Sequence, residues 1–382
     1  MIKSIIAVTR EIDDAAAAAA EILEAVKPEA NLLKNSLGII SCFSEFAETG
    51  ALEAICEALP FDCIGATTCL SAAGREIDQI LFSITVLTSY DCSFKTAMIP
   101  VSEDYEKNIA AAAAGLTDRS GENPALVLSY FPLMYNLSGD MLLSSIDEVL
   151  NGAPLFGTVA VDHTVDYSAA STIYNGEMFR EAVVLGAVWG DVDVWFEVAA
   201  LNENKIRKQK AVITESSGNI LMGVNGKTAL EYLEEIGLTR AELSMGLGIV
   251  PLVIDHNDGT KPVARGVFSV TPEGYAVCGG AMPKNATLAL GAIEGEDVLQ
   301  ITGDALKSFK EKDSVILGYS CIARYLTLGA DSTAEARIVT EAAMDTGCFF
   351  AHSGGEICPL PDTDGKLKNY FHNYSIVLCK LS

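Results

Sequence analysis

The chain has 382 residues, of which 49% are hydrophobic and 20% charged, so it suits an ordered globular protein of two or three domains. Its 51 acidic and 26 basic side chains give a formal charge of −25, which repels nucleic-acid phosphates and anionic lipid surfaces. We therefore expect neither nucleic acid nor a membrane as a partner. No signal peptide is recognisable, and no apolar run approaches the roughly 20 residues of a membrane span, so we expect a cytoplasmic protein.

Ten cysteines are spread along the chain, most of them in apolar runs and none in a C-x-x-C pair. This pattern indicates reduced, buried thiols rather than disulfides. A zinc site would need Cys and His side chains clustered at ligand spacing, and the sequence contains no such cluster. It also lacks the P-loop, the dinucleotide-binding glycine motif, G-x-S-x-G and H-E-x-x-H. We therefore expect no metal and no cofactor.

In chain order, the first expected helix is the alanine-rich stretch "IDDAAAAAAEILEAVKP", which begins with acidic residues and is ended by Pro28. Three stretches then repeat one order of elements: Leu37 to Ser89, Ala125 to Gly190 and Ser314 to Ser382. Each reads as strand, helix, strand, small-residue turn and strand. Apolar β-rich runs alternate there with segments whose apolar positions recur at three and four, which indicates strands and helices in turn.

The Asn175-Gly176 pair in "IYNGEMF" predicts a tight hairpin, so some strands must pair antiparallel. The fold class we expect is α+β, with layered mixed, largely antiparallel sheets and helices on the outer faces, built from repeated strand-helix-strand-strand units. The turns around Ser216 to Gly226 interrupt the repeat. We therefore divide the chain into residues 1–226, with two repeat units, and 227–382, with the third unit at 314–382.

Several motifs, in their order and spacing, resemble the FIST domain, a bacterial and archaeal sensory module with N-terminal and C-terminal parts. On the C-terminal side, "VILGYSCIARYLTLG" fits a C-x-x-R core, and "FFAHSGGEI" with "YFHNYSIVL" fits a Gly-Glu corner and a His-Asn strand entry. On the N-terminal side, the motifs are "IGATTCLSAAG", "APLFGTVAVD", "IYNGEMFREAVVLGAVWG" and "AVITESSGNILMGVNGKTALEYL". The resemblance covers nearly the whole chain.

This resemblance implies a sensor of small ligands, with amino acids as the ligand class. Many relatives join the module to a kinase or chemoreceptor-like output, and we expect no such output in this chain. The resemblance therefore implies a protein that signals through a separate protein partner or as a homodimer.

Two opposite charges are the sharpest candidates for the ligand site. Arg324 follows the apolar run "VILGYS", and Glu356 follows Gly354-Gly355. A buried arginine needs a carboxylate or a similar acceptor, which here is either Glu356 in a structural ion pair or the carboxylate of a ligand. Glu356 is either an ordinary turn residue or a group that binds a ligand ammonium. Together, Arg324 and Glu356 have the charges that an α-amino acid requires.

Further site candidates are Cys321, Asp162, His372 and Asn373. Cys321 and His372 have the residue types of a thiolate nucleophile and its base, although His372-Asn373 equally suits a hydrogen-bonded strand entry. Asp162 ends "FGTVAVD", where it either faces the same cleft or caps a turn. We expect an amino-acid sensor rather than an enzyme. A Cys321-dependent enzyme and a protein-interaction scaffold without a small ligand stay open as alternatives.

Overall fold

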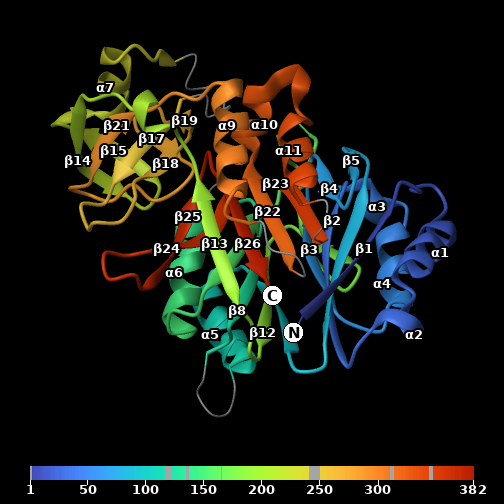
Figure 1. Cartoon of the computed structure of the whole chain (residues 1–382). Helices are drawn as coiled ribbons and strands as arrows, with labels where there is room; N and C mark the ends of the chain where they lie inside the picture. The colour runs from blue at the N-terminus through green and yellow to red at the C-terminus, as the bar shows by residue number, and fades with distance from the viewer. Residues whose placement is uncertain are drawn as a thin grey trace.

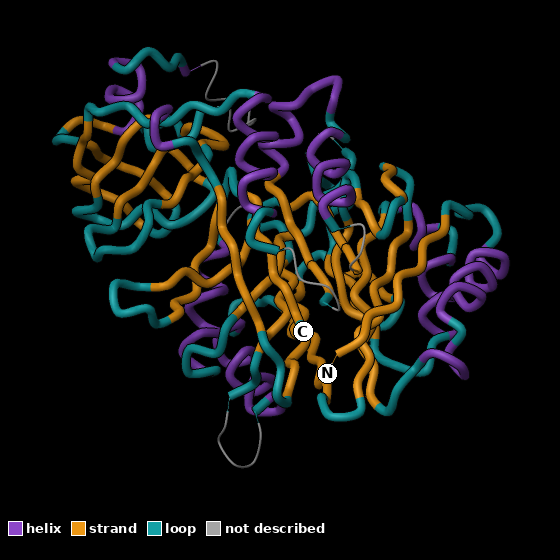
Figure 2. The backbone as a smooth tube through the Cα atoms, viewed as in Figure 1, coloured by secondary structure: helices purple, strands orange, loops and turns teal. Residues whose placement is uncertain are grey.

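Each of the three repeated stretches builds one six-stranded sheet of the computed structural model, and an eight-stranded sheet is inserted in the third unit (Figure 1). The structure describes residues 2–117, 123–134, 137–164, 166–240, 250–309, 314–343 and 347–382. The expected fold class is confirmed: mixed, largely antiparallel sheets carry helices on one face (Figure 2).

The first two units have the same order of elements. The first consists of β1 (Ile2–Thr9), α1 (Ala15–Val26), α2 (Pro28–Asn31), β2 (Asn35–Cys42), α3 (Glu45–Glu48), α4 (Ala51–Ala58), β3 (Cys63–Thr67), β4 (Ser71–Ala73), β5 (Glu76–Asp78) and β6 (Phe82–Ser89). The second consists of β7 (Ser93–Pro100), α5 (Tyr105–Leu116), β8 (Leu126–Phe131), α6 (Gly139–Val149), β9 (Leu155–Val159), β10 (Thr172–Tyr174), β11 (Glu177–Phe179) and β12 (Ala182–Trp189).

The third unit, predicted at 314–382, also includes β13 and α9 in the structure, and it keeps this order around the insertion. It consists of β13 (Val194–Ala199), α9 (Gly295–Leu306), β22 (Val315–Cys321), α10 (Ile322–Leu328), η2 (Gly329–Asp331), α11 (Ala334–Ala342), β23 (Gly347–Ser353), β24 (Glu356–Pro361), β25 (Leu367–His372) and β26 (Ile376–Leu381). In every unit, the second strand (β2, β8 or β22) runs parallel to the strand after it (β3, β9 or β23) and antiparallel to the last strand (β6, β12 or β26).

The three sheets exchange hairpins in a closed ring. Hairpin β10–β11 of the second unit joins the first sheet beside β3, hairpin β24–β25 of the third unit joins the second sheet beside β9, and hairpin β4–β5 of the first unit joins the third sheet beside β23. The expected tight turn between β10 and β11 is confirmed, because Asn175 and Gly176 have φ angles of 48° and 89°. Each sheet is therefore completed by another unit.

Helix α1 begins and ends where the sequence predicts. Asp14 accepts hydrogen bonds from the N–H groups of Ala16 and Ala17 at the start of α1, and Lys27 in the left-handed conformation ends it before Pro28. Ala18 and Ile22, four residues apart on the buried face of α1, pack against the strands of the first sheet.

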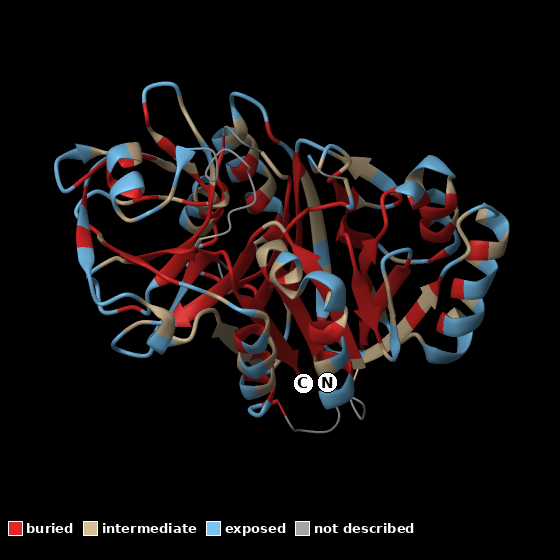
Figure 3. Ribbon diagram, turned by 90° about the horizontal axis from the view of Figure 1, so that it is seen from above, coloured by how far each residue is buried: buried red, intermediate tan, exposed pale blue. Residues whose placement is uncertain are grey.

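A central core lies between the three sheets, and the helices cover their outer faces. Alternation along β2 sends Leu37 and Ile39 to the central core and Ile40 to the core under α1 and α4. β22 does the same, with Leu317 facing the centre and Ile316 facing the helices α9 and α11. Figure 3 shows the buried residues concentrated in the strands and the exposed ones along the outer helices.

The insertion lies between β13 and α9. It consists of η1 (Glu203–Lys205), β14 (Lys210–Ser217), β15 (Ile220–Val224), β16 (Lys227–Thr228), α7 (Ala229–Glu235), β17 (Leu252–Asp255), β18 (Val263–Arg265), β19 (Val267–Val270), β20 (Ala276–Cys278) and β21 (Thr287–Leu290). The division of the chain at Gly226 stays a prediction; in the structure this residue lies in the turn between β15 and β16. Among the helices of the described ranges, none is both long and apolar enough to cross a membrane.

One testable consequence of the close strand pairing in the second sheet concerns Gly157 of β9, which lies between β8 and the incoming hairpin. A Cβ at Gly157 would meet the carbonyl oxygen of Ser129 in the neighbouring strand. We expect Gly157→Ala to lower the free energy of unfolding, measured in urea, by about 1–3 kcal/mol because the strands must separate. Gly115→Ala, on the exposed side of α5 with no atom within 4 Å of the added carbon, is the control and should be neutral or slightly stabilising. Equal stability of Gly157→Ala and the wild type would contradict this account.

Candidate functional site

A cleft of about 940 Å³ lies between the inserted sheet and the third unit. It is bounded by β13 and the segment 200–210, by β14, β17, β18 and β21 of the insertion, by α9, and by the β24–β25 hairpin. Its volume is within the range of small-ligand sites, which commonly form where two structural units meet.

The floor of the cleft is apolar. Val253 and Val263 of the insertion and Leu360 of the hairpin are buried there. An apolar floor gains free energy by covering the hydrocarbon part of a ligand, and polar groups around it then fix the orientation.

The rim of the cleft is charged and of mixed sign. Two of its basic residues are already neutralised, because Lys210 faces Asp255 at 4.0 Å and Lys307 faces Asp304 at 2.5 Å. The remaining basic residues have no ion pair within 4 Å in the part of the chain that the structure describes: Arg207, Lys208 and Lys261. In a chain of net charge −25, these three cations are available to an anionic group.

Glu197 of β13 supplies a carboxylate in the same cleft. Burial raises the pKa of Glu197, and the nearby Lys261 ammonium acts in the opposite direction. The cleft thus presents a partly buried carboxylate close to a cation, which is the pair of charges that a zwitterion can match.

His372 and Asn373, two of the residues predicted from the sequence, line this cleft. His372 Nε2 lies 2.9 Å from the carbonyl oxygen of Cys358. A carbonyl can only accept, so Nε2 carries the proton and Nδ1 is an acceptor in the neutral ring. Burial lowers the pKa of His372 to about 4, which keeps the ring neutral at pH 7. Asn373 is also buried, and its Oδ1 has no hydrogen-bond partner among the described residues.

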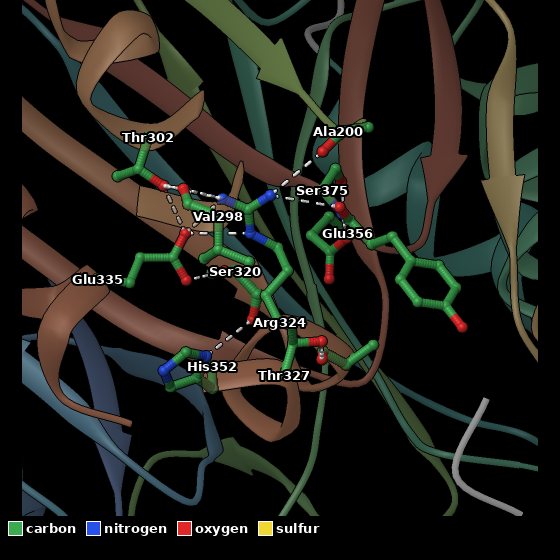
Figure 4. Close-up of polar contacts among 12 residues, drawn as sticks. Ala200, Val298, Thr302, Ser320, Arg324, Thr327, Glu335, His352, Glu356 and Ser375 are labelled. Carbon is green, nitrogen blue, oxygen red and sulfur yellow. Dashed lines mark hydrogen bonds and ion pairs between the residues drawn. The ribbon is translucent and has the colours of Figure 1, made fainter. Parts of the chain in front are cut away.

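Arg324 does not line the cleft; Figure 4 shows its guanidinium between Glu335, Thr302 and the carbonyl of Ala200, which is a cleft residue. The Arg324 side chain is completely buried, and Nη2 and Nε contact Oε1 of Glu335 at 2.6 and 3.0 Å. The guanidinium also reaches the backbone of the cleft, since Nη1 donates to the carbonyl oxygen of Ala200 at 3.3 Å. The ion pair considered from the sequence, Arg324 with Glu356, is corrected: the carboxylate that Arg324 contacts is Glu335, in the first turn of helix α11.

Glu335 shows the electrostatic effect of that contact. Burial by itself would raise the pKa of Glu335, but the Arg324 guanidinium holds it below its ordinary value. Oε2 of Glu335 also accepts from Ser320 at 2.7 Å, and Thr302 donates to Oε1 at 2.6 Å. The buried carboxylate therefore has a full set of partners.

Glu356 is the opposite case. It is completely buried, Oε2 accepts from Ser375 Oγ at 2.7 Å, and Oε1 has no hydrogen-bond partner in the described part of the chain. Burial raises the pKa of Glu356 to about 8. Glu356 is therefore largely protonated at pH 7 and lies beneath the cleft, across the β24–β25 pair from His372.

Cys321 and Asp162 have local roles in the structure. Cys321 is 3% exposed, and burial raises the pKa of its thiol well above the usual value, which disfavours a thiolate nucleophile. The Asp162 carboxylate accepts from the N–H groups of Thr164 and Ala169, so it caps the loop that follows β9. The structure thus brings His372 and Asn373 to the cleft, keeps Arg324 and Glu356 out of its lining, and leaves Asp162 in another loop.

The charged rim was missed in the sequence. Lys205, Arg207, Lys208 and Lys210 fall within six consecutive residues of an acidic chain. This local excess of positive charge was the signal that could have identified the rim. Lys261 carried no such signal, because a single lysine next to a proline resembles any solvated turn.

A buried ion pair joins the inserted sheet to the second unit. Arg265 of β18 contacts Asp140 of α6 at 3.1 Å and donates to the carbonyl oxygen of Phe371 at 2.9 Å. Arg265 and Phe371 are the chain neighbours of Ala264 and His372, which line the cleft. The Arg265–Asp140 pair therefore holds the position of the strand that forms one wall.

Comparisons with known proteins give one family. A model described as the FIST N domain matches residues 36–227, and a model described as the FIST C domain matches residues 229–359. None of the curated proteins compared with the chain matches it. Among solved structures, a cyanuric acid hydrolase from A. caulinodans is similar over 100% of this chain and 99% of its own, with 8% sequence identity and a TM-score of 0.42.

Breaking the buried Arg324–Glu335 ion pair should lower the stability of the protein substantially. Arg324→Ala leaves the Glu335 carboxylate buried without a counter-charge, and we expect the free energy of unfolding to fall by about 3–5 kcal/mol. The control is Arg337→Ala in α11, which removes an exposed ion pair with Asp331 and should cost less than about 1 kcal/mol. Urea unfolding of both variants measures the difference, and similar losses would contradict the structural role given to Arg324.

The raised pKa of Glu356 predicts that the stability of the fold depends on pH, with a definite sign. The Glu356 carboxyl has a pKa near 4.5 when unfolded and about 8 when folded, so folding takes up a proton between these values. The stability that this group contributes is complete below pH 4.5 and is lost as the pH rises through 8. We expect Glu356→Gln, which stays neutral, to gain stability relative to the wild type over this window. Unfolding curves at pH 5, 7 and 9 measure the difference, and a pH-independent difference would contradict the pKa given to Glu356.

Proposed function

The chain belongs to the FIST family, and from this premise we propose that it is a sensory protein that binds a small amino-acid-like carboxylate in the cleft between the inserted sheet and the third unit. FIST domains as a class are sensory modules for small ligands. The observation that carries the proposal for this chain is the cleft itself, whose apolar floor is surrounded by cations that form no ion pair with any residue the structure describes.

Charge supports an amino-acid-like ligand. A carboxylate would be held by Lys261 together with Arg207 or Lys208, because none of the three forms an ion pair within 4 Å with another described residue. An ammonium would be held by Glu197 or by the Nδ1 acceptor of His372. The apolar side chain of the ligand would cover the floor.

In this proposal, Arg324 is a positioning residue. It does not touch the ligand, but it fixes the carbonyl of Ala200 at the edge of the cleft. Asn373 lies in the wall, and Glu356 and Cys321 lie beneath it. The proposed ligand site therefore keeps His372 and Asn373 from the sequence prediction and adds Lys261, Arg207, Lys208 and Glu197.

Sensing requires that the bound and free states differ in structure or stability. β18 supplies Val263 and Ala264 to the cleft and Arg265 to the contact with Asp140. We propose that the ligand biases the position of the inserted sheet against the second unit through this strand. The signal would pass to a separate cytoplasmic protein partner, or through a homodimer.

The test is a thermal-shift screen of the full chain against amino acids and small carboxylates. A ligand that binds only the folded protein stabilises it by about 2.7 kcal/mol at 100 times its Kd. We expect one chemical class to raise the unfolding temperature, and Lys261→Ala to weaken that affinity about tenfold, since a hydrogen bond to a charged group is worth about 1.5–3 kcal/mol.

The control for this screen is Lys284→Ala, an exposed lysine of the inserted sheet outside the cleft. It should leave the ligand affinity unchanged. A panel without any shift, or a shift that both lysine variants leave intact, would contradict the proposed site.

A further inference from the structure

Two free sheet edges face the cleft. β13 is the end strand of its sheet and pairs with β26, while β18 is the end strand of the inserted sheet and pairs with β17. Both supply residues to the cleft: Val198 and Ala199 from β13, Val263 and Ala264 from β18. An end strand presents backbone N–H and C=O groups on its open side, and such an edge is a template for another extended chain.

The register identifies the open groups of β13. Asp193 and Ser382 exchange two backbone hydrogen bonds, at 3.3 and 3.1 Å. Bonded and non-bonded pairs alternate in an antiparallel ladder, and the register runs without a break from Val194 to Ala199. Val194, Phe196 and Val198 therefore direct their N–H and C=O groups away from β26. Of these three, Val198 lines the cleft.

We infer, building on the proposed function, that the ligand is a short peptide with a free C-terminal carboxylate, bound as an added strand on the open edge of β13. Its main chain exchanges hydrogen bonds with the N–H and C=O of Val198. Its carboxylate is held at the rim by Arg207, Lys208 and Lys261, the cleft cations that form no ion pair with another described residue. This is strand addition, in which backbone bonds give affinity and pockets take alternate side chains.

Three observations favour a peptide over a free amino acid. A free amino acid has no amide N–H and C=O to exchange with the pair on Val198. The cleft of about 940 Å³ lies at the upper end of the range for small ligands. The apolar floor of Val253, Val263 and Leu360 takes one side chain, while the next side chain of an extended peptide points the other way.

Calorimetric titration of the full chain with Ala-X-Ala tripeptides, in which X is each apolar amino acid in turn, tests the inference. We expect at least one tripeptide to bind at least tenfold more tightly than the free amino acid X. Methylation of the nitrogen of X, or amidation of the C-terminus, should each weaken that peptide by at least about threefold, because each removes a hydrogen bond or a charge contact.

Val198→Pro removes the open N–H without removing a ladder bond to β26. We expect it to weaken the tripeptide about three- to tenfold, the value of one backbone hydrogen bond. Val194→Pro is the matched control, because Val194 has the same orientation on β13 and lies outside the cleft. Thermal unfolding shows whether both variants fold, and the N-methylated peptide gives the same information on the unaltered protein.

The outcomes separate the two proposals. Equal affinity for amino acid and tripeptide, with no effect of N-methylation or Val198→Pro, would overturn the peptide inference and leave the small-carboxylate site in place. An unchanged affinity for the C-terminally amidated peptide would overturn the role given to the cations. The absence of binding by tripeptides and free amino acids alike would overturn both proposals.

Discussion

The exchange of hairpins is the constraint on which the rest of the structure depends. Each six-stranded sheet is completed by two strands of another unit, so none of the three units has its full set of backbone partners alone. The exchange also positions the cleft. Hairpin β24–β25 pairs with β9 of the second unit, and its far strand carries Tyr370 to His372 to the inserted sheet. The wall that holds His372 and Asn373 is thus fixed by two units at once.

Charge is distributed in two different ways around this wall. Inside, the Arg324 guanidinium is matched by Glu335 and by backbone and hydroxyl acceptors, so its ionic groups are satisfied without a ligand. At the rim, Lys261 and its two basic neighbours have no such match among the described residues. A buried, satisfied pair stabilises one conformation, whereas available cations beside an apolar floor favour an external anion. For this reason we propose that the ligand carboxylate contacts the cations of the rim and not Arg324, which the sequence had suggested.

The sequence predicted the repeats well because they follow from local rules. The apolar β-rich runs of β2 and β22, the Asn175-Gly176 turn and the end of α1 at Pro28 are all signals within a few residues. Such local rules do not identify the partner of Arg324. The contacting carboxylate is Glu335, eleven residues later on a helix, and charge alone does not distinguish it from Glu356. The hairpin exchange and the cleft depend on pairings across more than a hundred residues, for which one sequence contains no signal. His372 and Asn373 were found through motif resemblance instead.

The most direct test of the central claim is a crystal structure of the protein with the tightest-binding compound from the amino-acid and tripeptide panels. The account predicts electron density for the compound between β13, β18 and α9, with its carboxylate within hydrogen-bonding distance of Lys261, Arg207 or Lys208. Density on another face of the molecule, or beside Glu356 beneath the hairpin, would contradict the assignment of the cleft as the ligand site.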